Sequence, residues 1–220
     1  MDNLLEELGN REKEINEYLK LLAFIDGTEL TRMDGRQFDV NTLLTKTLKG
    51  VVFLLLYNLI ESTMREAISF IHDSILSNRV TYEDLRLELK KELWKRAKNN
   101  NLKTDDLVDG TSGGISANLH QVTYDSKKIF SGNVVRDEIK KLARIYGFSE
   151  STEYSKTGGG NQLEQIKENR NDLAHGNKTF SEVGSGNTVA DLKSLSDKVI
   201  HYIYEIIDNI DYCVEHKKYR

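Results

Sequence analysis

The run VVFLLLYNLI, residues 51–60, is the most apolar stretch of the chain. Apolar side chains continue at helical spacing on both sides of it, so one long helix is predicted from about residue 40 to residue 77. A membrane-spanning helix needs about 20 consecutive apolar residues. This run is shorter, with Lys46 and Lys49 before it and Glu61 after it. We therefore interpret it as a helix of the protein core, with no membrane contact.

Helical periodicity continues outward from this helix in both directions, and the chain contains no proline. Further helices are predicted at about 3–25, 85–98, 134–148, 161–175 and 188–216. Loops are expected at 99–133, 151–160 and 176–187, with no convincing strand. Start and stop signals flank several of these helices: capping boxes at Thr81/Asp84, Asn161/Glu164 and Thr188/Asp191, and stops at Gly147 and Gly176.

These elements predict an all-α fold, a helical bundle with long loops in a single domain of residues 1–220. Residues 1–38 would form the N-terminal helix and turn, 39–216 the core bundle, and 217–220 a basic, frayed tail. Cys213 is the only cysteine, which excludes an internal disulfide and favours a reducing, cytoplasmic location. The isolated histidines and the cysteine show no metal-ligand spacing, so neither a metal nor a cofactor is expected.

The net charge is −4, so any contact with nucleic acid must use a local basic patch. The run KKLARIY, residues 140–146, together with Lys127 and Lys128, is one candidate. It could contact phosphates, or it could be the solvated face of a helix.

The segment ENRNDLAHG, residues 168–176, places an arginine in the apolar stripe of the helix predicted at 161–175. Leu163, Ile166, Leu173 and Ala174 form the stripe, and Arg170 falls in its middle. Arginine is seldom fully buried without a partner. Arg170 must therefore extend to solvent, pair with a carboxylate as a structural register pair, or line a cleft.

His175 ends the same helix, about 140° around the axis from Arg170. Two interpretations are open for it. A histidine at a helix C-terminus can simply bond the last carbonyls and interact favourably with the helix dipole. A histidine with a pKa near neutrality beside a guanidinium also suits phosphoryl chemistry, because it can transfer a proton while the arginine holds phosphate oxygens.

RNDLAHG, residues 170–176, resembles the R-x4-6-H motif of the HEPN superfamily, particularly the form RNxxAHG of prokaryotic members. The resemblance implies an α-helical bundle that forms a homodimer with the two motifs facing each other across a cleft. It also implies a metal-independent endoribonuclease used as a toxin or in anti-phage defence, acting on an RNA such as tRNA or mRNA. A cognate antitoxin or a defence-system protein would be its partner.

Carried over by position, Arg170 and His175 would be the catalytic pair and Asn171 would position the histidine or the phosphate. Glu61 is the candidate for a supporting polar residue on the long helix, although an ordinary helical ion pair with Arg65 would also explain it. The superfamily includes members without activity. The alternative is therefore a catalytically inactive HEPN module for dimerisation or for binding an antitoxin or a nuclease.

Overall fold

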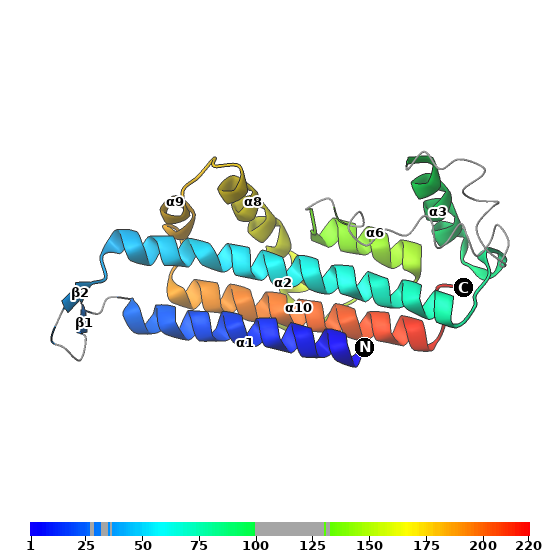
Figure 1. Cartoon of the computed structure of the whole chain (residues 1–220), viewed down its shortest axis with the longest axis horizontal. Coiled ribbons are helices and arrows are strands. Elements are labelled where there is room, and N and C mark those ends of the chain that lie inside the picture. Colours follow the sequence, from blue (N-terminus) through cyan, green and yellow to red (C-terminus); the bar gives the residue numbers. More distant parts are fainter. Residues whose placement is uncertain (27–28, 32–34, 36, 100–129, 131–132) are drawn as a thin grey trace.

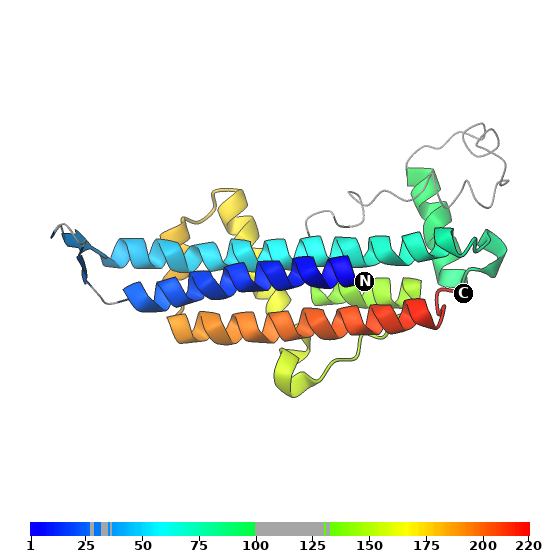
Figure 2. The same ribbon diagram turned by 60° about the horizontal axis from the view of Figure 1, so that its bottom comes forward.

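In the computed structural model, three long helices pack side by side and set the length of the molecule (Figure 1). They are α1 (Asp2–Ile25), α2 (Thr42–Ser77) and α10 (Val189–Glu215). α1 runs antiparallel to α2, whereas α10 runs in the same direction as α2 (Figure 2). The structure describes residues 1–26, 29–31, 35, 37–99, 130 and 133–220. The predicted all-α class is confirmed.

α2 is the central helix because apolar side chains cover most of its circumference. The helix begins after Asn41, whose side chain accepts a hydrogen bond of 2.9 Å from the Leu44 N–H. By length and composition alone α2 could cross a membrane, a test that the core helix of a soluble protein also passes. Here α2 packs against α1, α8, α9 and α10. The run at 51–60 thus belongs to a core helix, as predicted.

A short hairpin connects α1 to α2, where the sequence indicated turns and no strands. β1 (Glu29–Thr31) pairs antiparallel with β2 (Gln37–Asp39), and Leu30 lies opposite Phe38. The prediction was wrong here because three residues are too few to show the alternation that identifies a strand.

Two further helices lie toward the C-terminal end of α2 (Figure 1). They are α3 (Leu87–Asn99), which follows the 3-10 turn η1 (Tyr82–Asp84), and α6 (Arg136–Tyr146). The capping box of Thr81 and Asp84 is present, although it caps η1 instead of α3. Gly147 ends α6 in the left-handed conformation with φ of 93°, as predicted. Most of the loop predicted at 99–133 lies outside the described residues.

Two segments predicted as loops contain short helices instead. The first segment contains α7 (Tyr154–Thr157) and the 3-10 turn η3 (Gly158–Gly160). The second contains α9 (Phe180–Gly184), which begins with a capping box formed by Thr179 and Glu182. Helices of three to five residues are too short to show a helical period, so the sequence pattern misses them. Packing holds η3 in place: a Cβ on Gly160 would lie 2.7 Å from the Tyr202 ring.

The C-terminal residues pack onto the bundle, which corrects the expectation of a frayed tail. The Tyr219 side chain is fully buried, and its hydroxyl lies 3.2 Å from the Ser74 Oγ on α2. The Tyr219 carbonyl also accepts a hydrogen bond of 3.0 Å from the Arg86 N–H. An aromatic side chain near the terminus thus secures a segment whose basic composition indicated a solvated tail.

Candidate functional site

Both residues of the sequence motif lie at the C-terminal end of α8 (Gln162–Ala174). Leu163 and Ile166 of the predicted stripe are fully buried, whereas Leu173 is half-buried and Ala174 is exposed. The apolar stripe therefore ends before the motif does. Arg170 lies at the boundary, half-buried.

The predicted capping box at the start of α8 is not formed. Asn161 has helical backbone angles and makes no side-chain cap bond, because η3 leads directly into α8. Its side-chain oxygen instead accepts a hydrogen bond of 2.9 Å from Nη1 of Arg136. The start of α8 is thus tied to α6.

A Schellman turn at the end of α8 fixes the position of His175. Gly176 adopts φ of 70°, its N–H bonds the Leu173 carbonyl at 3.3 Å, and the Asn177 N–H bonds the Asp172 carbonyl at 2.8 Å. The His175 side chain is exposed and makes no hydrogen bond or ion pair with a described residue. The backbone of this histidine is therefore held firmly while its ring is accessible.

Asp172 reinforces the same turn through its side chain. Its carboxylate accepts hydrogen bonds from Lys178 Nζ at 2.6 Å and from Asn177 Nδ2 at 3.4 Å. The bond from Lys178 is the main reason that the pKa of Asp172 lies below its usual value. The sequence analysis missed this role, because a bond that reaches six residues across a glycine turn follows no helical spacing.

Arg170 packs on an aromatic ring of α2. Its guanidinium carbon lies 4.5 Å from the centre of the Tyr57 ring, which is fully buried. Nη1 of Arg170 donates a hydrogen bond of 2.9 Å to Oδ1 of Asn171. Arg170 makes no ion pair with a carboxylate among the described residues. It is thus neither a buried register pair nor a freely solvated side chain.

Tyr57 is a second residue that the sequence pattern does not reveal, since one aromatic in the run 51–60 looks like ordinary core. Burial raises the pKa of its hydroxyl, and the charge of Glu61 raises this pKa further, whereas the charge of Arg170 lowers it. The hydroxyl also accepts a hydrogen bond of 3.5 Å from the Val134 N–H. Tyr57 therefore connects the motif helix to α2 and to the start of α6.

Glu61 lies one helical turn after Tyr57 and forms an ion pair with Arg65. This is the ordinary helical pair that the sequence offered as an alternative for Glu61. The Glu61 side chain is 18% exposed, and its charge still acts on Tyr57. Glu61 thus acts on the same tyrosine on which Arg170 packs.

Within one chain, Arg170 and His175 do not hydrogen-bond each other. Five residues of helix separate them by about 7.5 Å along the axis. The arginine packs toward α2 and the histidine faces solvent. No set of three or more His, Cys, Asp or Glu side chains among the described residues is placed to hold a metal ion. The chemistry available here is phosphate binding by a guanidinium and proton transfer by an imidazole.

Comparison with known proteins extends the resemblance seen in the motif. The family model for HEPN_MAE_28990-like HEPN proteins matches residues 1–219. Neither the curated proteins nor the solved structures give a match. The family match includes α1 and the C-terminal segment, far beyond the motif itself. The chain belongs to the HEPN_MAE_28990-like HEPN family.

Proposed function

We propose that this chain is a metal-independent endoribonuclease that cleaves RNA at the end of α8 and serves as a toxin or an anti-phage defence effector. Membership of the HEPN family supports a nuclease or a related HEPN module. The side chains at the motif favour the nuclease. We expect the substrate to be tRNA or mRNA and a cognate antitoxin or defence protein to control the activity.

The state of Arg170 carries this proposal. A guanidinium has five N–H donors, and among the described residues Arg170 donates a single hydrogen bond, to Asn171. The guanidinium lies over the Tyr57 ring, which attracts the cation without neutralising its charge. The cation is thus held in place while it keeps donors for phosphate oxygens.

The proposed reaction begins when the ribose 2′-oxygen attacks the adjacent phosphorus. The new oxygen–phosphorus bond closes a 2′,3′-cyclic phosphate, and the bond to the 5′-oxygen of the next nucleotide breaks. His175 takes the proton of the 2′-hydroxyl or gives a proton to the leaving 5′-oxygen. Arg170 stabilises the negative charge that develops on the phosphate. DNA should not be cleaved because it lacks the 2′-hydroxyl.

In-line cleavage places the base and the acid on opposite sides of the phosphorus. Each chain supplies one histidine at the end of α8, and this histidine is exposed. We therefore place the active site between two copies of the chain, each contributing its own Arg170 and His175.

In the alternative, an inactive module for dimerisation or partner binding, Arg170 would be a buried register pair. Arg170 is only half-buried and has no carboxylate partner among the described residues. Replacing it with alanine should therefore lower the free energy of unfolding by at most about 2 kcal/mol, the range of a cation–π contact. Breaking a buried ion pair would cost about 3–5 kcal/mol.

The test is RNA cleavage in EDTA. Total cellular RNA and tRNA are incubated with the wild-type chain, Arg170→Ala and His175→Ala, and new ends are assayed for cyclic phosphate. We expect cleavage by the wild type that both substitutions abolish. A folded, dimeric wild type that leaves all RNA intact would contradict the proposal and favour the binding module.

A further inference from the structure

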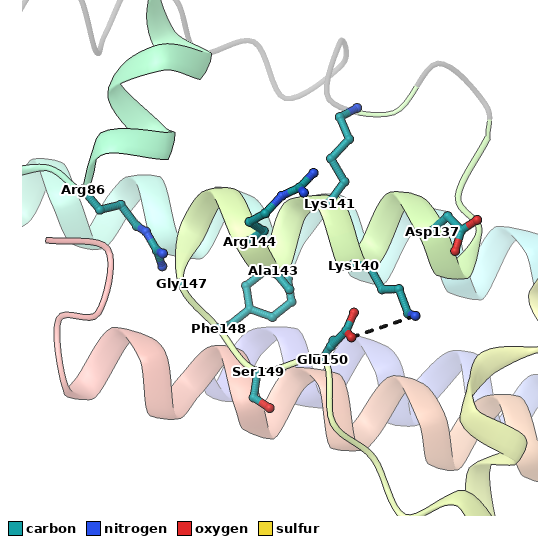
Figure 3. A pocket seen from close by; sticks show the side chains of 10 residues that line it. All are labelled: Arg86, Asp137, Lys140, Lys141, Ala143, Arg144, Gly147, Phe148, Ser149 and Glu150. Atoms are coloured by element: carbon teal, nitrogen blue, oxygen red, sulfur yellow. Dashed lines mark ion pairs between the residues drawn. The ribbon is translucent and has the colours of Figure 1, made fainter.

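A pocket of about 720 Å³ lies beside α6 (Figure 3), and none of its lining residues belongs to α8 or to the motif. Its walls come from α6, from the segment that follows Gly147, and from the residue before α3. It is lined by Arg86, Asp137, Lys140, Lys141, Ala143, Arg144, Gly147, Phe148, Ser149 and Glu150. Pockets of this size hold small organic ligands or parts of larger ones.

The lining is strongly basic for a chain whose net charge is −4, with four lysine or arginine side chains against two carboxylates. Arg144 is exposed and makes no ion pair with a described residue. Lys140 lies 3.9 Å from the Glu150 carboxylate, a loose contact at the surface. The other two cations have carboxylate partners outside the lining: Lys141 pairs with Glu138 at 2.7 Å and Arg86 with Glu88 at 3.4 Å. Arg144 and Lys140 are therefore the cations most available to an anionic ligand.

Arg86 is built into the pocket. It approaches α6 from the start of α3, opposite the side chains that project from α6 (Figure 3). A Cβ on Gly147 would lie 2.1 Å from Nη1 of Arg86 and 2.5 Å from the Lys218 carbonyl. Arg86 thus fills the space that the missing side chain of Gly147 leaves. Its exposed side-chain fraction of 27% shows a guanidinium held against the protein.

The floor of the pocket is apolar. Phe148 and Ala143 are both buried, yet both line the cavity. A ligand with a phosphate group and a sugar or base would match a cationic rim above an apolar floor. The run KKLARIY at 140–146, open to two interpretations in the sequence, supplies three of the four cations.

We propose that this pocket binds the phosphate group of a nucleotide unit and that its natural ligand is a stretch of RNA backbone outside the cleavage site. That the ligand is RNA rests on the proposed function. That the pocket binds a phosphate group rests on its lining alone. A free nucleotide carries the same phosphate group, and the experiment separates the two sources.

The experiment measures binding of a short fluorescent single-stranded RNA to the full-length chain by anisotropy across a salt series. All proteins carry His175→Ala so that the RNA stays intact. The pocket variant is Lys140→Ala/Arg144→Ala. Its matched control, Lys13→Ala/Lys20→Ala, removes the same charge from exposed positions on α1. Circular dichroism confirms that both variants are folded.

We expect the pocket variant alone to weaken RNA binding and to make the plot of log affinity against log salt shallower by about 1.4, or about 0.7 for each lost phosphate contact. Adenosine monophosphate is added as a competitor. If adenosine monophosphate displaces the RNA, and the pocket variant no longer binds adenosine monophosphate, the site takes a free nucleotide phosphate. Equal effects of the two variants on RNA, with no pocket-dependent binding of the nucleotide, would overturn the proposal. RNA cleavage is measured separately with proteins that keep His175. Failure of the proposed nuclease function can therefore be distinguished from failure of the proposed phosphate site.

Discussion

At the scale of single residues, an arginine in an apolar stripe is accommodated by an aromatic face. Arg170 is half-buried, and the Tyr57 ring beneath it is fully buried. A guanidinium is weakly hydrated and stacks well on aromatic rings, so its placement here needs no carboxylate. Because no salt bridge among the described residues neutralises it, the positive charge of Arg170 can interact with a ligand.

Tyr57 should therefore act as a positioning residue for Arg170. Tyr57→Leu removes the ring, and we expect kcat/KM for RNA cleavage to fall about tenfold, equivalent to a cation–π contact of ~1.4 kcal/mol. Tyr57→Phe keeps the ring and should rescue most of the activity, although it loses the bond from Val134. Steady-state kinetics of both variants measure this effect. Equal losses in the two variants would show that the ring face is unimportant.

Gly176 should matter for its backbone angle alone. It adopts φ of 70°, and a Cβ there would meet nothing within 4 Å. Gly176→Ala should thus lower the free energy of unfolding by about 1–2 kcal/mol and reduce cleavage by moving His175.

Gly186→Ala is the matched control. A Cβ at this position also meets nothing within 4 Å, and its φ lies outside the left-handed range. Urea unfolding and RNA cleavage of the two variants measure the difference. If they behave alike, the Schellman turn does not position His175.

The sequence predicts the motif residues more easily than their supports. Arg170 and His175 stand out because one interrupts an apolar stripe and the other precedes a glycine stop. Tyr57 and Asp172 do not stand out. The contact of Tyr57 with Arg170 joins two helices that are distant in the chain, and Asp172 bonds across a turn. Helical periodicity encodes neither relation.

At the scale of elements, the segment after the motif is anchored by a close crossing of α9 and α2. A Cβ on Gly50 would lie 2.3 Å from the Phe180 carbonyl oxygen, and a Cβ on Gly184 would lie 1.9 Å from the Lys46 carbonyl oxygen. The backbones of the two helices touch because both positions are glycine. This contact fixes one end of the segment that begins at His175.

Gly50→Ala should therefore destabilise the protein by about 1–3 kcal/mol, the usual cost of overpacking. Gly9→Ala is the control, since Gly9 lies inside α1 and a Cβ there would have its nearest neighbour, the Tyr204 hydroxyl, at 3.9 Å. Gly9→Ala should stabilise by up to about 1 kcal/mol. Thermal denaturation measures both effects, and a neutral Gly50→Ala would mean that α9 moves easily on α2.

Strong local signals made several helix ends predictable. The capping box of Thr188 and Asp191 and the stop at Gly147 were found where the sequence placed them. The hairpin, α7 and α9 were missed because packing decides elements this short. Asn161 had the right residue type for a cap, but the preceding turn η3 already continues into α8.

At the scale of the whole molecule, acid should lower the stability of the protein. Hydrogen bonds lower the pKa values of carboxylates that hold turns and helix starts, namely Asp84, Glu153, Asp172, Glu182 and Asp191. A folded-state pKa below the unfolded one means that the unfolded state binds more protons as the pH falls. The stabilisation is thus present above about pH 4 and is lost below it. Melting temperatures across a pH series test this, and a Tm that rises below pH 4 would contradict it.

The family match over residues 1–219 places nearly the whole molecule within one HEPN architecture. α8 and α9 pack against the long helix α2, and the residues of the motif lie at the C-terminal end of α8. The net charge of −4 remains compatible with RNA as a substrate because cations gather locally beside α6 and at Arg170.

The most direct test of the account compares two histidines. Single-turnover cleavage of one defined RNA in EDTA is measured for the wild type, for His175→Ala and for His201→Ala, which alters an exposed histidine on α10. Loss of a proton-transfer group should slow cleavage by about 10²–10⁴-fold in His175→Ala, and His201→Ala should cleave at the wild-type rate. A His175→Ala protein that cleaves as fast as His201→Ala would show that the end of α8 is not the active site.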